Sequence, residues 1–298
     1  MRMIRTLFIS FFLLFSFLNI IRAEESKDRL SNLLLQKVEY LLPYEPIDVV
    51  IPCAEKDREI LDLCIEGIRK NGKNIRRIIV VSARQMTRKA EWFDEKNYPF
   101  SDRDLAEQIF GDEKLARNYL SKPSRIGWIK QQLYKLYAAL VIPGISSNVL
   151  VLDADTIFLA PVEFLGRQGE GLYNPGKEHY KPYFIHAAKL IPGWRKIHAS
   201  YSGISHHMLF QRSVIQDLFQ IIESFHRVEA WKAICRCIDL NEVYGSSLSE
   251  YELYFNFVFA RSSQMKIRPL KWKNVATLDL LSKYRRRGYS YISCHSYF

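Results

Sequence analysis

The chain has 298 residues, 48% of them hydrophobic and 25% charged, which is an ordinary globular composition with enough apolar material for a substantial core, so one large α/β domain is the simplest expectation. Lysine and arginine exceed aspartate and glutamate by 43 to 32, a balance that suits a diphosphate ligand, an anionic membrane surface or nucleic acid and selects none of them. The five cysteines show neither dense spacing nor a Cys-x-x-Cys pair, which excludes a disulfide scaffold and a cysteine-only zinc site.

Residues 1–23 have the features of a targeting segment. Two arginines precede an apolar run over residues 7–21, and Ala23 is suited to the position before a cleavage site, although Ile21 is large for that motif. The run of 15 residues is short for a membrane span, which needs about 20. A cleaved signal and an uncleaved anchor both remain open, and either predicts an exported or membrane-anchored protein.

Residues 24–46 are expected to lead into the domain. Apolar residues recur at helical spacing from Leu30 to Leu41, and prolines follow at 43 and 46, so the pattern predicts a helix over residues 26–44. The domain proper then spans residues 47–298. No stretch within it is long and apolar enough to cross a bilayer.

The domain opens with a βαβ unit. Residues 47–52 and 78–82 are short apolar strands, and residues 57–70 between them form an amphipathic helix, so the two strands are expected to be parallel. Residues 84–125 are polar and irregular, which favours an excursion over the surface that helps to hold an acceptor.

A helix over residues 128–140 then precedes a buried strand over residues 148–152, and Pro143-Gly144 separates the two. The second half of the chain adds a strand at 207–211, a helix at 213–225 capped by Ser213, a helix at 249–260 and a closing strand that ends at Cys294.

Asp153-Ala154-Asp155 follows the buried strand directly. In an open parallel sheet, ligands bind outside the carboxyl ends of the strands, so both carboxylates are expected at the binding edge. Mg²⁺ and Mn²⁺ favour hard oxygen ligands and leave positions open for substrate phosphates. The sequence therefore predicts a Mn²⁺ or Mg²⁺ site at Asp153 and Asp155, which would neutralise a bound diphosphate.

A second Asp-x-Asp pair serves as an internal control. Asp102-Arg103-Asp104 follows Ser101 and precedes a helix-like segment, so it is expected to form a helix cap and first turn. The spacing alone is therefore weak evidence for a metal site. The buried strand before Asp153 makes the difference.

Lys135-Leu136, a spacer and then the run from Val149 to Thr156 resemble the donor-site region of the glycogenin-like GT-A glycosyltransferases. Three further segments, 127–133, 206–209 and 249–252, are similar to a poorly characterised bacterial family of GT-A-like proteins. The resemblance covers most of the chain from residue 47 onward. It implies a GT-A fold, in which a Rossmann-like nucleotide-binding half with a mixed sheet flanked by helices is fused to an acceptor half in one domain.

The resemblance also suggests further ligands for the metal and the donor. His295 is similar to the C-terminal histidine that joins the two carboxylates on the metal in many GT-A enzymes. Lys135 is expected to face the donor phosphates, unless it extends off the edge of its helix into solvent. Asp57 is a candidate to hold the nucleotide base or ribose, with a helix N-cap as its alternative role.

Glu250 is the candidate catalytic residue, because an inverting transfer needs a general base for the acceptor hydroxyl. Ser249 and Glu252 fit a capping box that does not use Glu250. His206 and His207 are adjacent on a predicted strand and point to opposite faces, so at most one faces the site, and we assign the donor-contacting role to His207.

The function predicted from the sequence is a metal-dependent, hexosyltransferase-like enzyme. It would move a sugar from a nucleotide-diphosphate sugar donor to a glycan, lipid or protein acceptor, with possible membrane association and no nucleic acid partner. Phosphotransferases of the haloacid dehalogenase type also begin with a strand and Asp-x-Asp, but Ile157 stands where they carry Thr or Val. The alternative is an exported, non-catalytic carbohydrate-binding or surface-interaction protein. Retention and inversion at the sugar are both open.

Overall fold

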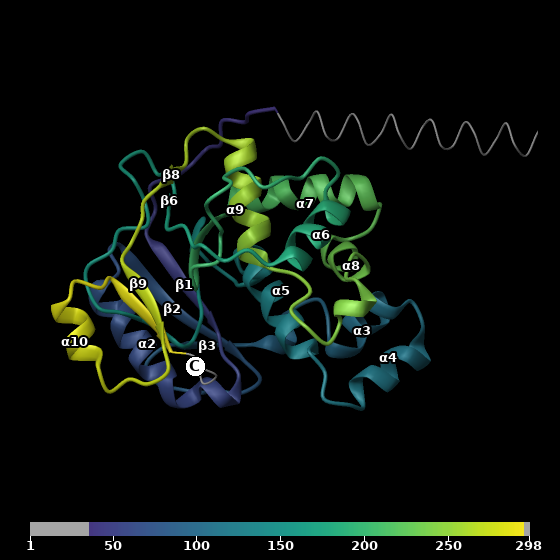
Figure 1. The fold of residues 1–298 in the computed structure, drawn as a ribbon, viewed down its shortest axis with the longest axis horizontal. Coiled ribbons are helices and arrows are strands. Elements are labelled where there is room, and N and C mark those ends of the chain that lie inside the picture. The colour runs from purple at the N-terminus through teal and green to yellow at the C-terminus, as the bar shows by residue number, and fades with distance from the viewer. Residues whose placement is uncertain (1–35, 295–298) are drawn as a thin grey trace, which may run out of the picture.

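A computed structural model describes residues 36–294, and its core is a five-stranded sheet with helices on both faces (Figure 1). The strands are β1 (Ile47–Pro52), β2 (Ile75–Ser82), β3 (Glu91–Asp94), β4 (Asn148–Leu152), β5 (Thr156–Phe158), β6 (Leu172–Tyr173), β7 (His207–Gln211), β8 (Lys266–Ile267), β9 (Trp272–Val275) and β10 (Tyr291–Cys294). The helices are α2 (Arg58–Asn71), α3 (Asp102–Phe110), α4 (Glu113–Leu120), α5 (Ile126–Val141), α6 (Lys181–Leu190), α7 (Arg212–His226), α8 (Ala230–Arg236), α9 (Glu250–Arg261) and α10 (Leu281–Arg286).

The main sheet has the strand order β3-β2-β1-β4-β7. Its first four strands are parallel, and β7 runs antiparallel to β4 with Leu150 opposite Leu209. The central strands β1 and β4 are buried along their whole length, as expected of parallel strands covered on both faces. The prediction of one α/β domain with a Rossmann-like mixed sheet flanked by helices is confirmed.

Successive side chains of each strand point alternately into two hydrophobic cores, one on each face of the main sheet. Val50 and Val151 face the layer that includes α3, α5, α7 and α9, whereas Ile51 and Leu152 face α2. This alternation explains why residues 49–51 of β1 and 149–152 of β4 are all apolar. It also fixes α5 on the face of the sheet opposite to α2.

A second, three-stranded sheet joins the end of the chain to the end of β4. Its order is β5-β10-β9, and β10 is antiparallel to β5 with Ser293 opposite Thr156. Since β5 follows β4 after only Asp153-Ala154-Asp155, the last described residues lie beside the acidic turn.

Two local predictions are wrong. The helix predicted over residues 26–44 is absent from residues 36–44, where Val38 N donates instead to Arg261 O and Tyr40 Oη to Asp217, and the rest of that prediction lies outside the described residues. Tertiary contacts and the two prolines thus override the helical spacing. Ser213 does not cap α7; its hydroxyl donates to the carbonyl of Leu41.

The targeting segment lies outside the described residues. Within residues 36–294, no helix has the length and hydrophobicity that a bilayer crossing requires. All five cysteines are free thiols.

Candidate functional site

The Asp153-Ala154-Asp155 turn stands at the carboxyl edge of the parallel sheet, anchored from two other strands. Asp153 N donates to the carbonyl of His206, which precedes β7, at 3.0 Å. Asp155 accepts two hydrogen bonds from β10, from Cys294 N to its carbonyl at 2.9 Å and from Ser293 Oγ to its carboxylate at 3.0 Å. The sequence expectation for the position of this pair is met.

The carboxylate of Asp153 is held by three neighbouring side chains. Lys135 Nζ and Tyr251 Oη both donate to Oδ1, the tyrosine at 3.1 Å, and His206 Nδ1 lies 3.2 Å from Oδ2. Burial would raise the pKa of Asp153, but the charge of Lys135 and the contact with His206 outweigh burial and hold it below its ordinary value. The side chain is 23% exposed, so an ionised carboxylate reaches solvent at this edge.

Lys135 links Asp153 to Glu250. Its ammonium is buried, lies 4.4 Å from the centre of the Tyr251 ring, and donates to Glu250 Oε1 at 2.8 Å as well as to Asp153. Burial would lower the pKa of Lys135, but the two carboxylates raise it above its ordinary value. The alternative of a lysine extending off the helix edge is wrong. The ammonium points into the site and is shared by two acids.

Glu250 begins α9 and takes no part in capping it. Ser249 is the N-cap and accepts from Glu252 N at 3.2 Å, while the Glu252 carboxylate accepts from Gly203 N and the Asn256 side chain. Only the serine half of the predicted capping box therefore forms. Glu250 is 1% exposed, and its Oε2 has no hydrogen-bond partner within residues 36–294.

The pKa of Glu250 is raised. Desolvation is the largest cause and the nearby charge of Asp153 adds to it, while Lys135 partly offsets both. A buried carboxylate with one oxygen held by a cation and the other unpaired is poised to accept a proton or a hydrogen bond from a ligand.

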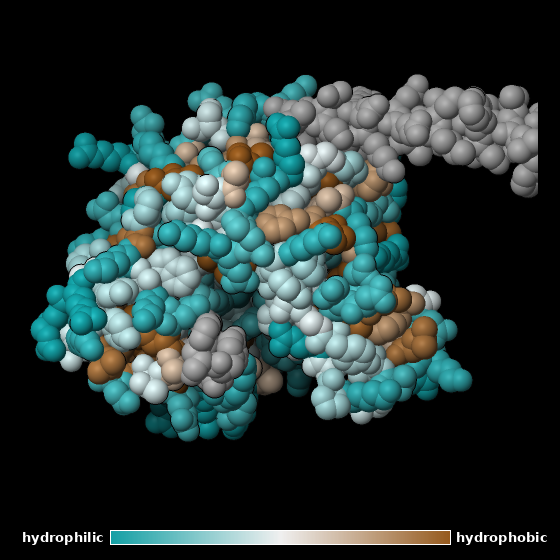
Figure 2. All heavy atoms as spheres, in the orientation of Figure 1, coloured by the Kyte–Doolittle hydropathy of each residue, from teal (hydrophilic) through white to brown (hydrophobic). Residues whose placement is uncertain are grey.

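These side chains line a cavity of about 1090 Å³. In Figure 2 the surface is hollowed between the part that carries β9 and α10 and the part that carries α5 and α6. The predicted residues Asp57, Lys135, Asp153, Asp155 and Glu250 all line this cavity. Asp57 occupies the N-cap position of α2, yet its side chain makes no capping hydrogen bond, so helix capping does not account for it.

The structure places His206, and not the predicted His207, in the cavity. His207 packs against the rings of Phe158, Phe164 and Tyr291, and burial lowers its pKa to about 3. His206 has φ of 62°, a left-handed conformation that is rare for this residue type and costly to hold. The strand alternation that guided the choice does not apply, because β7 begins only at His207.

Within the described residues, the candidate metal ligands at this site are the carboxylates of Asp153 and Asp155. Residues 36–294 contain no group of three or more His, Cys, Asp and Glu side chains arranged to hold a metal. His295, the predicted third ligand, lies outside the described residues. Asp153 and Asp155 offer the one or two carboxylates with which proteins bind Mg²⁺ together with substrate phosphates. The donor chemistry of these two residues fits a metal whose coordination is completed by substrate.

The control pair behaves as expected. Asp104 and Ser101 form a reciprocal capping box at the start of α3, and Asp102 pairs with Lys130 at 2.6 Å. The same Asp-x-Asp spacing thus forms a helix cap at Asp102 and Asp104 and part of the cavity wall at Asp153 and Asp155.

Tyr251 and Gln132 lie at the site but were not predicted as site residues from the sequence. Tyr251 follows Glu250 and donates to Asp153, and Gln132 lines the cavity one turn before Lys135 on α5. Helical spacing from Lys135 is the signal that could have found Gln132, because residues three apart share a helix face.

Three comparisons place the chain among known proteins. Residues 46–281 match the model of a family described as a family of unknown function (DUF6492). No curated protein matches significantly. Among solved structures, mouse xyloside xylosyltransferase 1 in its apo form is similar at 10% sequence identity and a TM-score of 0.39, over 84% of this chain and 97% of that one. At such a TM-score the likeness carries no weight for function.

Proposed function

We propose that this chain, which belongs to the DUF6492 family of unknown function, is a metal-dependent glycosyltransferase that uses a nucleoside-diphosphate sugar. The observation that carries the proposal is the position of Asp153 and Asp155. Both lie at the carboxyl edge of a parallel sheet, on the wall of a cavity large enough for a sugar nucleotide.

The charge of the cavity supports the need for a cation. A diphosphate alone would meet an excess of negative charge, because carboxylates outnumber lysine and arginine by seven to four among the described lining residues. Lys130 and Lys135 are moreover already paired with acids. The carboxylates are Asp57, Glu59, Glu95, Asp153, Asp155, Glu178 and Glu250, and the cations are Lys56, Arg125, Lys130 and Lys135.

We assign Asp153 and Asp155 as the residues that would hold Mn²⁺ or Mg²⁺, with His295 kept as a proposed third ligand. When bound, the ion would neutralise the diphosphate as ligand and leaving group. Lys135 would keep Asp153 ionised and correctly oriented. Asp57, on the α2 side of the cavity, remains our candidate for the base or ribose.

Glu250 is the proposed acceptor-side group. Its unpaired Oε2 can take the proton of an attacking hydroxyl, which would give inversion, or only bind that hydroxyl, which is compatible with retention. Its raised pKa would make it a stronger base than an exposed glutamate.

A non-catalytic carbohydrate-binding protein is the second candidate. The aromatic rings of Trp128, Tyr134 and Tyr183 line the same cavity and favour this reading as well as the first. The two differ in whether a nucleotide is bound at all.

Calorimetry with a panel of uridine and guanosine diphosphate sugars separates these candidates. The enzyme proposal predicts binding of at least one donor with Mn²⁺ or Mg²⁺ and none in EDTA. Absence of metal-dependent binding across the panel would remove the enzyme proposal and leave the binding protein.

The proposal includes export or membrane attachment through residues 1–23. Fractionation of cells that express the full chain or a variant starting at Glu24 tests this. Equal distribution of the two forms between compartments would contradict it.

A further inference from the structure

One face of α5 forms a continuous strip along the cavity. Trp128, Gln132 and Lys135 are spaced four and three residues apart, so their side chains lie on the same side of the helix, and all three line the cavity. Lys135 stands beside Glu250. Trp128 lies about 10 Å from Lys135 along the axis of α5. The strip therefore extends from the reactive acids toward the start of α5.

Three polar groups of this region have no hydrogen-bond partner within residues 36–294. One of them is Asn274 Oδ1, from the β9 side of the cavity. Glu250 Oε2 and Arg125 Nε are buried and equally unpaired. Buried polar groups in folded proteins almost always have hydrogen-bond partners. Three groups without such partners in one cavity therefore indicate a ligand that bonds to them.

The hydrogen-bonding needs of these groups restrict the chemistry of that ligand. Glu250 Oε2 and Asn274 Oδ1 each need a donor, and Arg125 Nε needs an acceptor. Gln132, which lines the same cavity, carries an amide that can both donate and accept. A hydroxyl donates and accepts. A phosphate only accepts and would face the charge of Glu250, whereas an alkyl chain would leave all three groups unpaired.

Trp128 adds an apolar surface to this polar set. Its ring is partly buried, and the Arg125 guanidinium lies 5.0 Å from the ring centre. A ligand that matches both features carries several hydroxyls around an apolar ring face, which describes a sugar. The strip is also longer than one hexose.

We infer that the acceptor is an oligosaccharide, with one sugar stacked on Trp128 and hydroxyls bound by Gln132 and Glu250. This inference rests on the proposed function and names its acceptor. Trp128 and Gln132 are then the residues that determine acceptor specificity, and neither is among the residues proposed to hold the metal.

The test uses the purified full chain on an array of immobilised neutral oligosaccharides, with a peptide array and phosphatidylglycerol vesicles as separate arms. Each variant is also titrated with UDP and GDP in Mn²⁺ by calorimetry. Trp92→Ala is the matched control, because Trp92 is 42% exposed and does not line the cavity.

We expect binding to at least one oligosaccharide class, weakened about tenfold by Trp128→Ala and by Gln132→Leu. Trp128→Phe should retain most of it, which keeps the test valid if the alanine variant folds poorly. Nucleotide binding should not change in any of these variants.

Binding to peptides or vesicles in place of oligosaccharides would overturn the inference, as would no binding in any arm or oligosaccharide binding that survives both substitutions. Failure of nucleotide binding with oligosaccharide binding intact would instead remove the enzyme proposal and leave the sugar site in place.

Discussion

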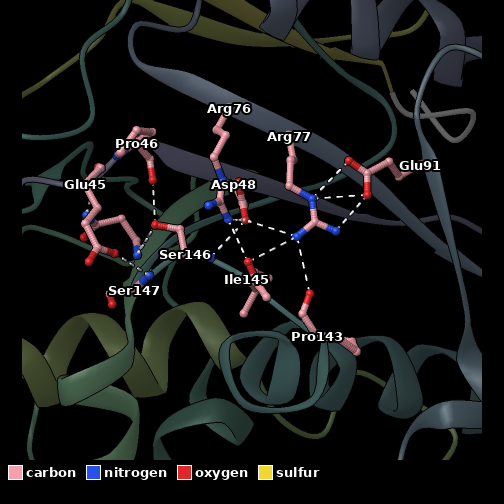
Figure 3. Close-up of polar contacts among 12 residues, drawn as sticks. Glu45, Pro46, Asp48, Arg76, Arg77, Glu91, Pro143, Ile145, Ser146 and Ser147 are labelled. Atoms are coloured by element: carbon pink, nitrogen blue, oxygen red, sulfur yellow. Dashed lines mark hydrogen bonds and ion pairs between the residues drawn. The ribbon is translucent and has the colours of Figure 1, made fainter.

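Two networks of carboxylates and cations, each built around a buried acid, lie at opposite ends of the strands of the main sheet. At the amino end of β1, Asp48 is fully buried and accepts from Arg76 Nε at 2.9 Å, Arg76 Nη2 at 2.6 Å and Ser146 N at 2.9 Å (Figure 3). Arg77 lies beside it and pairs with Glu91. At the carboxyl end of β4, Lys135 holds Asp153 and Glu250.

The two networks differ in what they leave unsatisfied. Both oxygens of Asp48 have partners, and none of the residues that hold it lines the large cavity. Glu250 is equally buried and lines that cavity, but its Oε2 has no hydrogen-bond partner among residues 36–294. Burial and ion pairing alone therefore do not mark a functional site. An incompletely satisfied network at a cavity does.

The largest effect on stability is expected at Lys135. Lys135→Met would leave Asp153 and Glu250 without their shared cation, and the free energy of unfolding should fall by about 4 kcal/mol. Urea denaturation measures this change. A variant as stable as the wild-type chain would show that Lys135 does not hold the two acids in place.

Glu250→Gln should separate function from stability. We expect kcat to fall about 100-fold, which is about 2.7 kcal/mol in activation free energy, with little change in unfolding. A general base must be deprotonated, and the pKa of Glu250 is raised. The kcat of the wild-type chain should therefore begin to decline with falling pH at a pH above the ordinary glutamate pKa of about 4.3. The variant should lack this decline. An acid limb that persists in it would contradict the role.

Asp48→Ala should lower the free energy of unfolding without changing metal-dependent nucleotide binding. The side chains of Arg76 and Arg77, which would lose their partner, are 42% and 27% exposed and can be hydrated again. The free energy of unfolding should therefore fall by about 2 kcal/mol, which is less than the fall expected for Lys135→Met. Thermal and urea unfolding report the loss. Any change in metal-dependent nucleotide binding would break the distinction between the two networks.

Ser146→Ala, which keeps the N–H that donates to Asp48 and removes only the hydroxyl, should have the mildest effect at this end of the sheet. The hydroxyl donates to Pro46 O and accepts from Asn148 N, so its removal should cost about 1 kcal/mol. A loss larger than that of Asp48→Ala would show that the serine, and not the aspartate, organises this edge of the sheet.

Local patterns were sufficient to predict part of this architecture. Apolar runs placed β1 and β4, helical spacing placed α5, and the strand before Asp153 distinguished the acidic pair from Asp102 and Asp104. Each of these features depends on neighbours in the sequence.

The remaining features depend on contacts between distant residues. Lys135 and Glu250 are 115 positions apart, so their ion pair has no local signal. The left-handed φ of His206 decides which histidine reaches the cavity, and residues 36–46 give up their helical pattern for bonds to Arg261 and Gln264.

The matched substitutions Asp155→Asn and Asp104→Asn test the central claim most directly, because both alter the second acid of an Asp-x-Asp pair. UDP and GDP are titrated by calorimetry into each variant and the wild-type chain, with Mn²⁺ and with EDTA. We expect Mn²⁺-dependent binding by the wild-type chain and by Asp104→Asn, and about 100-fold weaker binding by Asp155→Asn. Equal binding by all three proteins, or binding that persists in EDTA, would contradict it.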